Sequence, residues 1–270
     1  MNALKFFIGY IKHFLSAISI HNIHSPFVFQ ILTGMQLSDE DSDRIANIEK
    51  LRKGLLRDNS EIIFFEMGAG SKISSADQKE SGKPGIKRMM RDIIKSSVKP
   101  ELGVILYKLC RYFKPEVVVE LGTSAGISTA FLAMADPGGK IFTIENNPSS
   151  ADAAEKNFRE LGISNIEQIR GTFDNELPSL LGKLRKIDFI FIDGNHRKDP
   201  LLKYFELCLE KSHPSTVFIF DDIRWSDDML SGWESVRNHE RVSVTLDLFQ
   251  AGIAFLVTGI AKQHYRLRGI

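Results

Sequence analysis

Acidic residues recur at one kind of position in the second half of the sequence: each follows a short apolar segment and precedes a turn. Glu120, Glu145, Asp193 and Asp221 close four such segments, and Asp174 comes shortly after another. Carboxylates accept hydrogen bonds from ammonium groups and hydroxyls, and they bind hard cations. The spacing therefore predicts a site for a polar small molecule, assembled from the ends of successive strands.

The stretch ELGTSAG, residues 120–126, is typical of a tight turn that leads into a helix. Gly122 allows a sharp turn and a close approach of a ligand to the backbone. A nicotinamide-binding loop has glycines at its first, third and sixth positions, whereas the third and sixth positions from Gly122 are Ser124 and Ile127. The acid before the glycine suits a ligand with an ammonium group and no pyrophosphate. An ordinary strand-to-helix turn is the alternative interpretation.

Two further acids suit a nucleoside. Glu145 is placed to accept hydrogen bonds from both hydroxyls of a ribose. Asp174 is placed to accept one from an adenine amino group, with Phe173 near the ring. Solvated acids at strand ends are the alternative for each residue taken singly, but their recurrence on consecutive strands favours a binding site.

Asp193, Asp221 and Asp222 bring three carboxylates to the ends of two neighbouring strands. Like charges repel, and Mg²⁺ would compensate them with oxygen ligands around it. His196 is the one histidine that the pattern places at this edge, and an ordinary pKa of about 6.5 suits a general base. Helix caps and solvent contacts remain the alternative for the acids, and a histidine that only positions the substrate is the alternative for His196.

Apolar segments of strand length alternate with helical periodicity from residue 116 onward. The expected strands are 117–120, 140–145, 166–170, 187–193 and 216–221, and the helices between them are 127–135, 149–161, 177–184 and 200–209. Such alternation predicts parallel strands covered on both faces. After a helix at 227–238, segments 242–246 and 253–258 are joined by a short connection and predict a hairpin. The expected fold is a Rossmann-like α/β sheet of seven mostly parallel strands with an antiparallel edge hairpin.

Residues 1–99 predict a mainly helical region on the substrate side, and residues 100–270 predict the catalytic domain. Residues 72–99 carry eight Lys or Arg and three Asp or Glu. This stretch, in which a loop is expected at 71–86, is expected to cap the site and to attract an anionic acceptor, with a solvated helix–loop face as the alternative. The helix at 3–20 is expected to pack on the protein body or on a partner subunit, and peripheral membrane contact is the alternative.

Composition and charge argue against nucleic-acid-binding, secreted and membrane-spanning classes of protein. The net charge of +1 gives no general attraction to nucleic acid, and we find no pattern of a signal peptide or a membrane-spanning segment. Cys110 and Cys208 stand among apolar residues, which predicts buried free thiols and a cytoplasmic protein. The sequence does not determine the oligomeric state, and a homodimer is one of the alternatives.

Five stretches resemble class I S-adenosylmethionine-dependent methyltransferases of the small-molecule O-methyltransferase type. They are VVVELGTSAGISTAFLA, GKIFTIENN, IRGTFDNELPSL, IDFIFIDGNH and VFIFDDIRW. They follow one another in the expected order between about residues 100 and 258, while the first hundred residues lie outside the resemblance. The DGNH stretch is closer to a broad bacterial branch than to the catechol-like branch. The resemblance implies S-adenosylmethionine as cofactor and a small molecule as acceptor.

The resemblance also implies a role for each site residue. Cofactor binding is implied for Glu120, Gly122, Ser124, Gly126, Glu145, Asp174 and Asp193; Mg²⁺ binding for Asp193, Asp221 and Asp222; and catalysis for Asp193 and His196. Two positions depart from the catechol-like branch, because Asp222 replaces an Asn and His196 replaces a Lys. Both substitutions put a catechol acceptor in question, while His196 remains the expected base.

Two rival functions are consistent with the same fold. A nucleic-acid methyltransferase needs a basic surface with aromatic side chains, and residues 72–99 contain no aromatic residue, so we expect no nucleic-acid partner. A catalytically silent binding or scaffold protein would keep the motifs without turnover. The intact set of motifs favours the enzyme.

Overall fold

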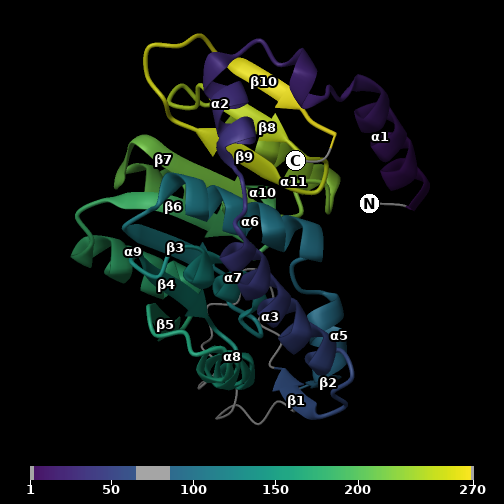
Figure 1. Cartoon of the computed structure of the whole chain (residues 1–270), viewed down its shortest axis with the longest axis vertical. Helices are drawn as coiled ribbons and strands as arrows, with labels where there is room; N and C mark the ends of the chain where they lie inside the picture. Colours follow the sequence, from purple (N-terminus) through teal and green to yellow (C-terminus); the bar gives the residue numbers. More distant parts are fainter. Residues whose placement is uncertain (1–2, 65–85, 269–270) are drawn as a thin grey trace. The chain divides into compact units, whose positions relative to one another are not determined.

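The computed structural model describes residues 3–64 and 86–268, which fall into two compact units (Figure 1). Unit 1 combines the first 35 residues with those from 183 onward, and unit 2 covers residues 36–182. This division differs from the boundary expected between residues 99 and 100. That boundary separated a substrate-side region from a catalytic domain, and this assignment of roles stays a prediction. The cap loop expected at 71–86 lies outside the described residues except for Ile86.

Unit 2 contains three parallel strands in the order β3, β4, β5. They are β3 (Val117–Leu121), β4 (Lys140–Glu145) and β5 (Ile166–Arg170), and the helices that follow them are α7 (Ile127–Ala135), α8 (Pro148–Glu160) and α9 (Phe173–Lys183). In register, Glu120 on β3 lies opposite Thr143 on β4, and Glu145 lies opposite Arg170 on β5. The carboxyl ends of the strands therefore deliver the predicted acids to one edge.

The remainder of unit 2 is mostly helical. It contains α3 (Asp39–Leu55), a two-stranded antiparallel hairpin of β1 (Glu61–Phe64) and β2 (Ile86–Met89), α5 (Met90–Lys95) and α6 (Pro100–Phe113). Residues 86–89 pair as a strand with β1, and Pro100 starts a helix separate from α5. Helix α6 packs closely on α7: a Cβ at Gly103 would lie 2.4 Å from the Phe131 ring.

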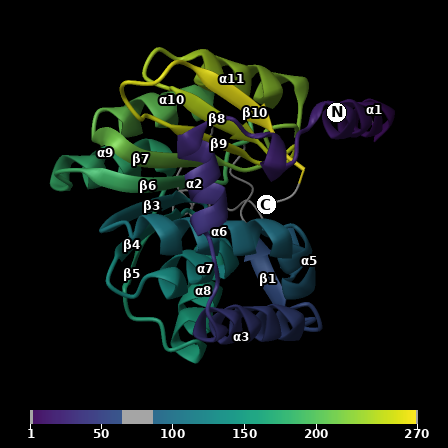
Figure 2. The same ribbon diagram turned by 45° about the horizontal axis from the view of Figure 1, so that its top comes forward.

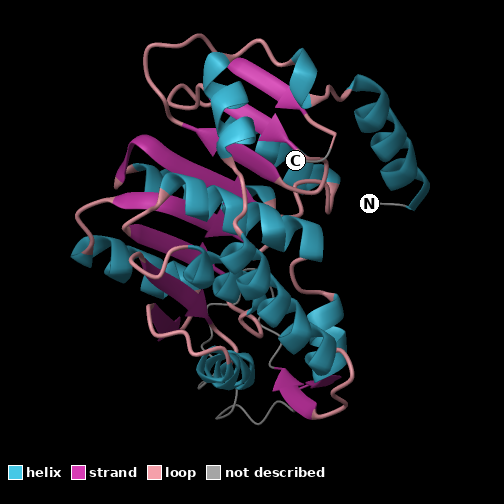
Figure 3. Cartoon of the chain, viewed as in Figure 1, coloured by secondary structure: helices cyan, strands magenta, loops and turns pink. Residues whose placement is uncertain are grey.

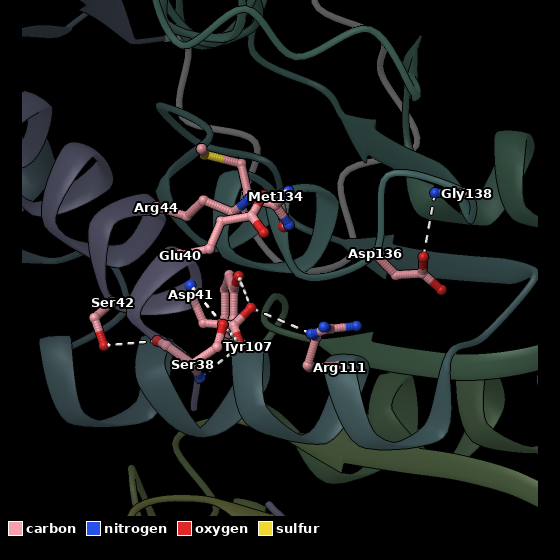
Figure 4. Close-up of polar contacts among 10 residues, drawn as sticks. All are labelled: Ser38, Glu40, Asp41, Ser42, Arg44, Tyr107, Arg111, Met134, Asp136 and Gly138. Carbon is pink, nitrogen blue, oxygen red and sulfur yellow. Dashed lines mark hydrogen bonds and ion pairs between the residues drawn. The ribbon is translucent and has the colours of Figure 1, made fainter. Parts of the chain in front are cut away.

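A buried carboxylate, Asp41, joins α3 to α6 (Figure 4). Its Oδ1 accepts hydrogen bonds from the Tyr107 hydroxyl at 2.8 Å and from Arg111 Nε at 3.2 Å. Its Oδ2 accepts the Ser38 backbone N–H at 2.9 Å, and the Ser38 hydroxyl in turn accepts the Asp41 N–H, which completes a capping box at the start of α3. One carboxylate thus both caps a helix and ties it to its neighbour.

The stability of unit 2 is expected to depend on pH through Asp41. Burial alone would raise the pKa of this carboxyl, but hydrogen bonds from Ser38 and Tyr107, together with Arg111, lower it from 3.8 to about 2. A depressed pKa stabilises the fold above the unfolded value and loses that contribution as the pH falls toward 2. Urea unfolding should therefore show a loss on the order of 1 to 2 kcal/mol between pH 4 and pH 2. Asp41→Asn should remove most of this pH-dependent part, and an equal slope in the variant would contradict the assignment.

Unit 1 holds a mixed sheet in the order β10, β8, β9, β7, β6 (Figure 3). Its strands are β6 (Ile187–Ile192), β7 (Ser212–Phe220), β8 (Val244–Asp247), β9 (Gly252–Phe255) and β10 (Gln263–Arg266), and its later helices are α10 (Lys198–Leu209) and α11 (Asp227–Asn238). Strands β6 and β7 are parallel, whereas β9 is antiparallel to both β7 and β8. The predicted hairpin is confirmed, but β10 pairs outside it, parallel to β8. Among the described residues, β10 thus adds an eighth strand to the seven that were expected.

An aromatic core supports the end of β7. Phe205 on α10 lies 5.0 Å from Phe218 and 6.0 Å from Phe220, measured between ring centroids, and Trp233 on α11 lies 5.7 Å from Phe220. These four rings are fully buried. Asp221 directly follows Phe220, so its backbone extends from a closely packed part of the sheet.

The start of unit 1 comprises α1 (Ala3–Ser16), the short 3₁₀ helix η1 (Ile20–Asn22) and α2 (Pro26–Gly34) (Figure 2). Helix α2 packs on the sheet through Phe27, whose ring lies edge-on to Phe255 at 5.3 Å. None of the described helices combines the length and the apolar character that a membrane span requires. Both cysteines are buried free thiols, as the sequence predicted.

Candidate active site

The loop between β3 and α7 has an unusual backbone. Gly122, Ser124 and Gly126 all have positive φ angles, of 108°, 49° and 81°. The Gly122 N–H donates to the Ile144 carbonyl at 3.1 Å, and the Gly126 N–H donates to the Thr123 carbonyl at 2.8 Å, so hydrogen bonds within the protein hold this backbone. The N-terminus of α7 follows directly at Ile127 and presents unpaired N–H groups.

Glu145 holds this loop in place. Its Oε2 accepts the Ser124 backbone N–H at 2.8 Å, and its Oε1 accepts the Asn147 backbone N–H at 2.7 Å. Burial raises the pKa of the Glu145 carboxyl, and these backbone N–H donors oppose the rise. The Asn146 backbone N–H also lowers this pKa, so three backbone donors surround the half-buried carboxylate, and vicinal hydroxyls would use the acceptor capacity that remains.

Glu120 lies beneath the surface of the protein, in the interior. Its side chain is completely buried, and Oε2 accepts hydrogen bonds from the Thr129 hydroxyl at 2.5 Å and the Thr143 hydroxyl at 2.6 Å. Burial raises the pKa of Glu120 despite these hydroxyl donors. Oε1 has no hydrogen-bond partner. Such an unpartnered buried oxygen fits either a ligand ammonium group or a protonated carboxyl.

Helix α8 supports the loop from behind. Asn157 donates from Nδ2 to the Ala125 carbonyl at 2.9 Å, and Asn147 caps the start of α8 by accepting the Ser150 N–H at 3.0 Å. A Cβ built at Gly126 would lie 2.4 Å from the Phe158 ring. The loop therefore needs glycine at this position for two reasons, its φ angle and the closeness of Phe158.

Gly126→Ala should destabilise the protein more than a glycine substitution that meets only the backbone penalty. The clash with Phe158 and the positive φ together should lower the free energy of unfolding by about 2 to 4 kcal/mol. Gly162→Ala is the matched control, because Gly162 has a φ of +68° and nothing within 4 Å of the added Cβ. The control should cost about 1 kcal/mol in urea unfolding. Equal losses in the two variants would show that Phe158 does not restrict the loop.

Asp174 lies exposed in the first turn of α9. It follows Gly171, whose φ is +155°, and Thr172, whose hydroxyl accepts the Asn175 N–H at 3.3 Å. An adenine contact by Asp174 stays a prediction. The structure thus gathers Glu120, Glu145 and the 122–126 loop closely in unit 2, with Asp174 one strand farther along.

In unit 1, the turn after β6 carries Asp193 and His196. His196 Nε2 lies 4.0 Å from Asp193 Oδ1, and His196 Nδ1 is buried without a hydrogen-bond partner. Burial lowers the pKa of His196, although the charge of Asp222 opposes the decrease. The imidazole is consequently neutral at neutral pH, the form that a general base requires.

Trp225 is a site residue that was not identified from the sequence. Its ring centroid lies 5.8 Å from that of His196, with an angle of 38° between the planes, and 62% of the residue is exposed. An exposed tryptophan beside a candidate base offers a flat apolar surface to a ring-shaped acceptor. The sequence could have indicated Trp225 through its position three residues after Asp222. A large aromatic residue in a loop at a strand end does not contribute to the core, so another role is expected for it.

Arg224 fixes the loop that carries Trp225. Its guanidinium donates to both oxygens of Asp247, at 2.7 and 2.6 Å, and to the Phe249 carbonyl at 2.6 Å. Both side chains of this ion pair are nearly buried. The loop after β7 is thus tied to the turn between β8 and β9, which limits the positions open to Trp225.

Asp221 and Asp222 follow β7 next to the end of β6. The Asp221 N–H donates to the Ile192 carbonyl at 3.0 Å, and the Asp222 N–H donates to Asp221 Oδ1 at 2.7 Å, with Asp222 in the left-handed region at φ 51°. Among the described residues, no three His, Cys, Asp or Glu side chains are grouped as a metal site would require. Mg²⁺ binding by Asp193, Asp221 and Asp222 stays a prediction.

Comparison with known proteins finds similarity over part of the chain. Residues 119–223 match the family model described as a methyltransferase domain. A catechol O-methyltransferase from Niastella koreensis is 36% identical over 130 residues, which are 47% of this chain and 58% of that protein. A second catechol O-methyltransferase, from Mycobacterium tuberculosis, is 29% identical over 129 residues, covering 47% and 57%. The chain thus matches little more than half the length of these curated relatives.

Solved structures agree. An O-methyltransferase from Bacillus cereus, in complex with SAH, is 28% identical, with a TM-score of 0.53 over 60% of this chain and 83% of that one. The match over residues 119–223 and the shared fold make this part of the chain similar to methyltransferase domains. An O-methyltransferase from Streptomyces achromogenes, at 24% identity and a TM-score of 0.51 over 73% and 93%, shows the same fold. The predicted Rossmann-like α/β fold of the methyltransferase domain is confirmed.

Proposed function

We propose that the protein transfers a methyl group from S-adenosylmethionine to a hydroxyl of a small, ring-containing acceptor. The observation that carries this proposal is the position of Glu145 at the end of β4, where its carboxylate accepts the backbone N–H of Ser124 in the 122–126 loop and that of Asn147. In a methyltransferase domain, such a carboxylate at a strand end suits the ribose of the cofactor.

The residues of unit 2 fit the cofactor. The 122–126 loop would receive the methionine carboxylate, Glu145 would receive the ribose hydroxyls, and Asp174 would receive the adenine amino group. Glu120 would act from beneath the loop, either on the ammonium group or by holding Thr129 and Thr143. Bound S-adenosylmethionine supplies an electrophilic methyl group on a positively charged sulfur.

Unit 1 would supply the acceptor side. His196, neutral because burial lowers its pKa, would take the proton from the acceptor hydroxyl at an unprotonated ring nitrogen. Asp193 would stabilise the imidazolium that forms, since its carboxylate lies 4.0 Å from Nε2. Trp225 would pack against the ring of the acceptor. An anionic acceptor and a role for Mg²⁺ stay predictions, and no step above depends on either.

A transfer assay tests the proposal. The purified chain is incubated with methyl-tritiated S-adenosylmethionine and a panel of small aromatic hydroxyl compounds that includes catechol, with EDTA in one arm and Mg²⁺ in the other. Transfer of label to at least one hydroxyl compound in the EDTA arm is expected. Transfer only in the Mg²⁺ arm would show that turnover depends on the metal and would support the site predicted at Asp193, Asp221 and Asp222. Cofactor binding without transfer to any compound would favour a silent binding protein.

A further inference from the structure

Helix α1 exposes an unusual amount of apolar surface. Phe7, Ile8, Ile11 and Leu15 are 59%, 44%, 41% and 73% exposed, and their spacing places them along one face of the helix. In both ribbon views, α1 runs outward from the strands of unit 1 (Figures 1 and 2). Exposed large apolar residues that gather on one helix face usually mark an interaction surface.

The opposite face of α1 is fixed to the rest of unit 1. The rings of Phe6 and Tyr10 each lie 5.1 Å from the ring of Phe249, measured between centroids. His13 is buried, and its Nε2 lies 3.3 Å from the Leu267 carbonyl oxygen. The helix therefore has one attached face and one apolar face that the described chain leaves uncovered.

Basic residues border the apolar face, and the acidic Asp247 near His13 is paired with Arg224. Residues 1–38 contain two Lys and residues 248–270 contain one Lys and two Arg, while neither segment contains Asp or Glu. Lys12 is exposed beside the apolar face. On the other flank, the Arg268 guanidinium lies 4.4 Å from the Phe14 ring centroid and donates to the Phe14 carbonyl at 2.9 Å.

A pocket of about 290 Å³ opens where α1 ends, and its lining includes Ser16, Arg237, His264 and Arg266. Arg266 donates to the Ser16 hydroxyl at 3.1 Å, and Arg237 Nε has no hydrogen-bond partner. Asp247 also lines the pocket, but Arg224 neutralises it. The pocket is therefore suited to an anionic group such as a phosphate.

We propose that α1 is a membrane-surface helix that binds anionic phospholipid bilayers. The apolar face enters the boundary between headgroups and acyl chains, and Lys12, Arg266 and Arg268 contact the anionic headgroups. An amphipathic helix with aromatic residues on one face and basic residues at its borders has the features of an interfacial helix. A second copy of the chain would satisfy the apolar face, but it would bring like charges together along both borders.

Vesicle flotation tests this proposal. The whole chain should float with vesicles of equal parts phosphatidylglycerol and phosphatidylcholine at low salt, and it should not float with phosphatidylcholine alone. Phe7→Ser combined with Leu15→Ser should weaken binding more than ~10-fold, because two inserted side chains are lost. Lys12→Gln should weaken it about fivefold. Phe29→Ser on α2 is the matched control, since Phe29 is 45% exposed outside α1, and it should bind like wild type.

Thermal unfolding of each variant verifies folding, which should be unchanged because the substituted side chains are exposed. Wild-type protein that stays unbound with phosphatidylglycerol vesicles would overturn the proposal, and so would a double variant that floats as wild type does. Sedimentation velocity tests whether a second copy of the chain binds the apolar face of α1 instead. A wild-type dimer that ignores vesicles and dissociates in the double variant would assign the apolar face to a second copy instead.

Discussion

Glu145→Ala is expected to weaken the binding of S-adenosylmethionine by 10- to 100-fold. The substitution removes the acceptor that would bond both ribose hydroxyls, and each such hydrogen bond contributes about 0.5 to 1.5 kcal/mol. It also releases the Ser124 N–H, now held at 2.8 Å, so the 122–126 loop loses its attachment to β4. Isothermal titration calorimetry of variant and wild type measures the ratio of dissociation constants.

Glu167→Ala is the control for Glu145→Ala. Glu167 lies on β5, half exposed, and its carboxylate is 3.4 Å from Lys140 Nζ, so the substitution removes the same charge from the same unit outside the candidate site. Binding should stay within twofold of wild type in the control. If Glu145→Ala also stayed within twofold, the carboxylate would not be the ribose acceptor and the proposed cofactor site would need another anchor.

His196→Ala is expected to lower kcat by about 10²- to 10⁴-fold while leaving the affinity for S-adenosylmethionine unchanged. The effect on turnover follows from the loss of the base, and the unchanged affinity follows because cofactor binding is assigned to residues of unit 2. His213→Ala is the control, because His213 pairs with Asp188 at 2.8 Å near the beginning of β6, away from the strand end that carries His196. Normal turnover in His196→Ala with the accepted substrate would exclude this residue as the base.

The pH profile gives a second measure of the same residue. Because burial lowers the pKa of His196, kcat should be lost as the pH falls below about 6.5 and should be flat above it. Asp222 raises this pKa, so Asp222→Asn should move the acidic limb of the profile to still lower pH. The assay is run with EDTA so that metal binding does not contribute. A limb that moves upward would show that Asp222 does not act on His196 electrostatically.

Most of the strands, and the acidic residues at the ends of β3 and β4, could be predicted from local sequence patterns. Strands that are buried on both faces are continuously apolar, so their ends were visible in the sequence, and the acids at those ends could be assigned to one edge. Glu145 illustrates this, because its place at the end of β4 and its contact with the 122–126 loop are consequences of parallel pairing. The two glycines of the loop, Gly122 and Gly126, could also be identified directly from the sequence.

Features that depend on long-range contacts could not be predicted. Strand β10 reads QHYR, a polar segment without alternation of apolar residues, and it forms only because β8 offers a free edge. The burial of Glu120 among hydroxyls depends on Thr129 and Thr143, which come from different elements. Whether three carboxylates converge is a question of side-chain direction, and spacing along the sequence does not determine it.

Calorimetric titration of the wild-type protein with S-adenosylmethionine and with its demethylated product tests the central claim most directly. We predict a dissociation constant in the micromolar range for both compounds, corresponding to about −8 kcal/mol. NAD, titrated in parallel, should produce no binding heat, because the loop lacks the glycines of a pyrophosphate site. Absence of heat with both methionine nucleosides would contradict the assignment and leave a methyltransferase fold that binds something else.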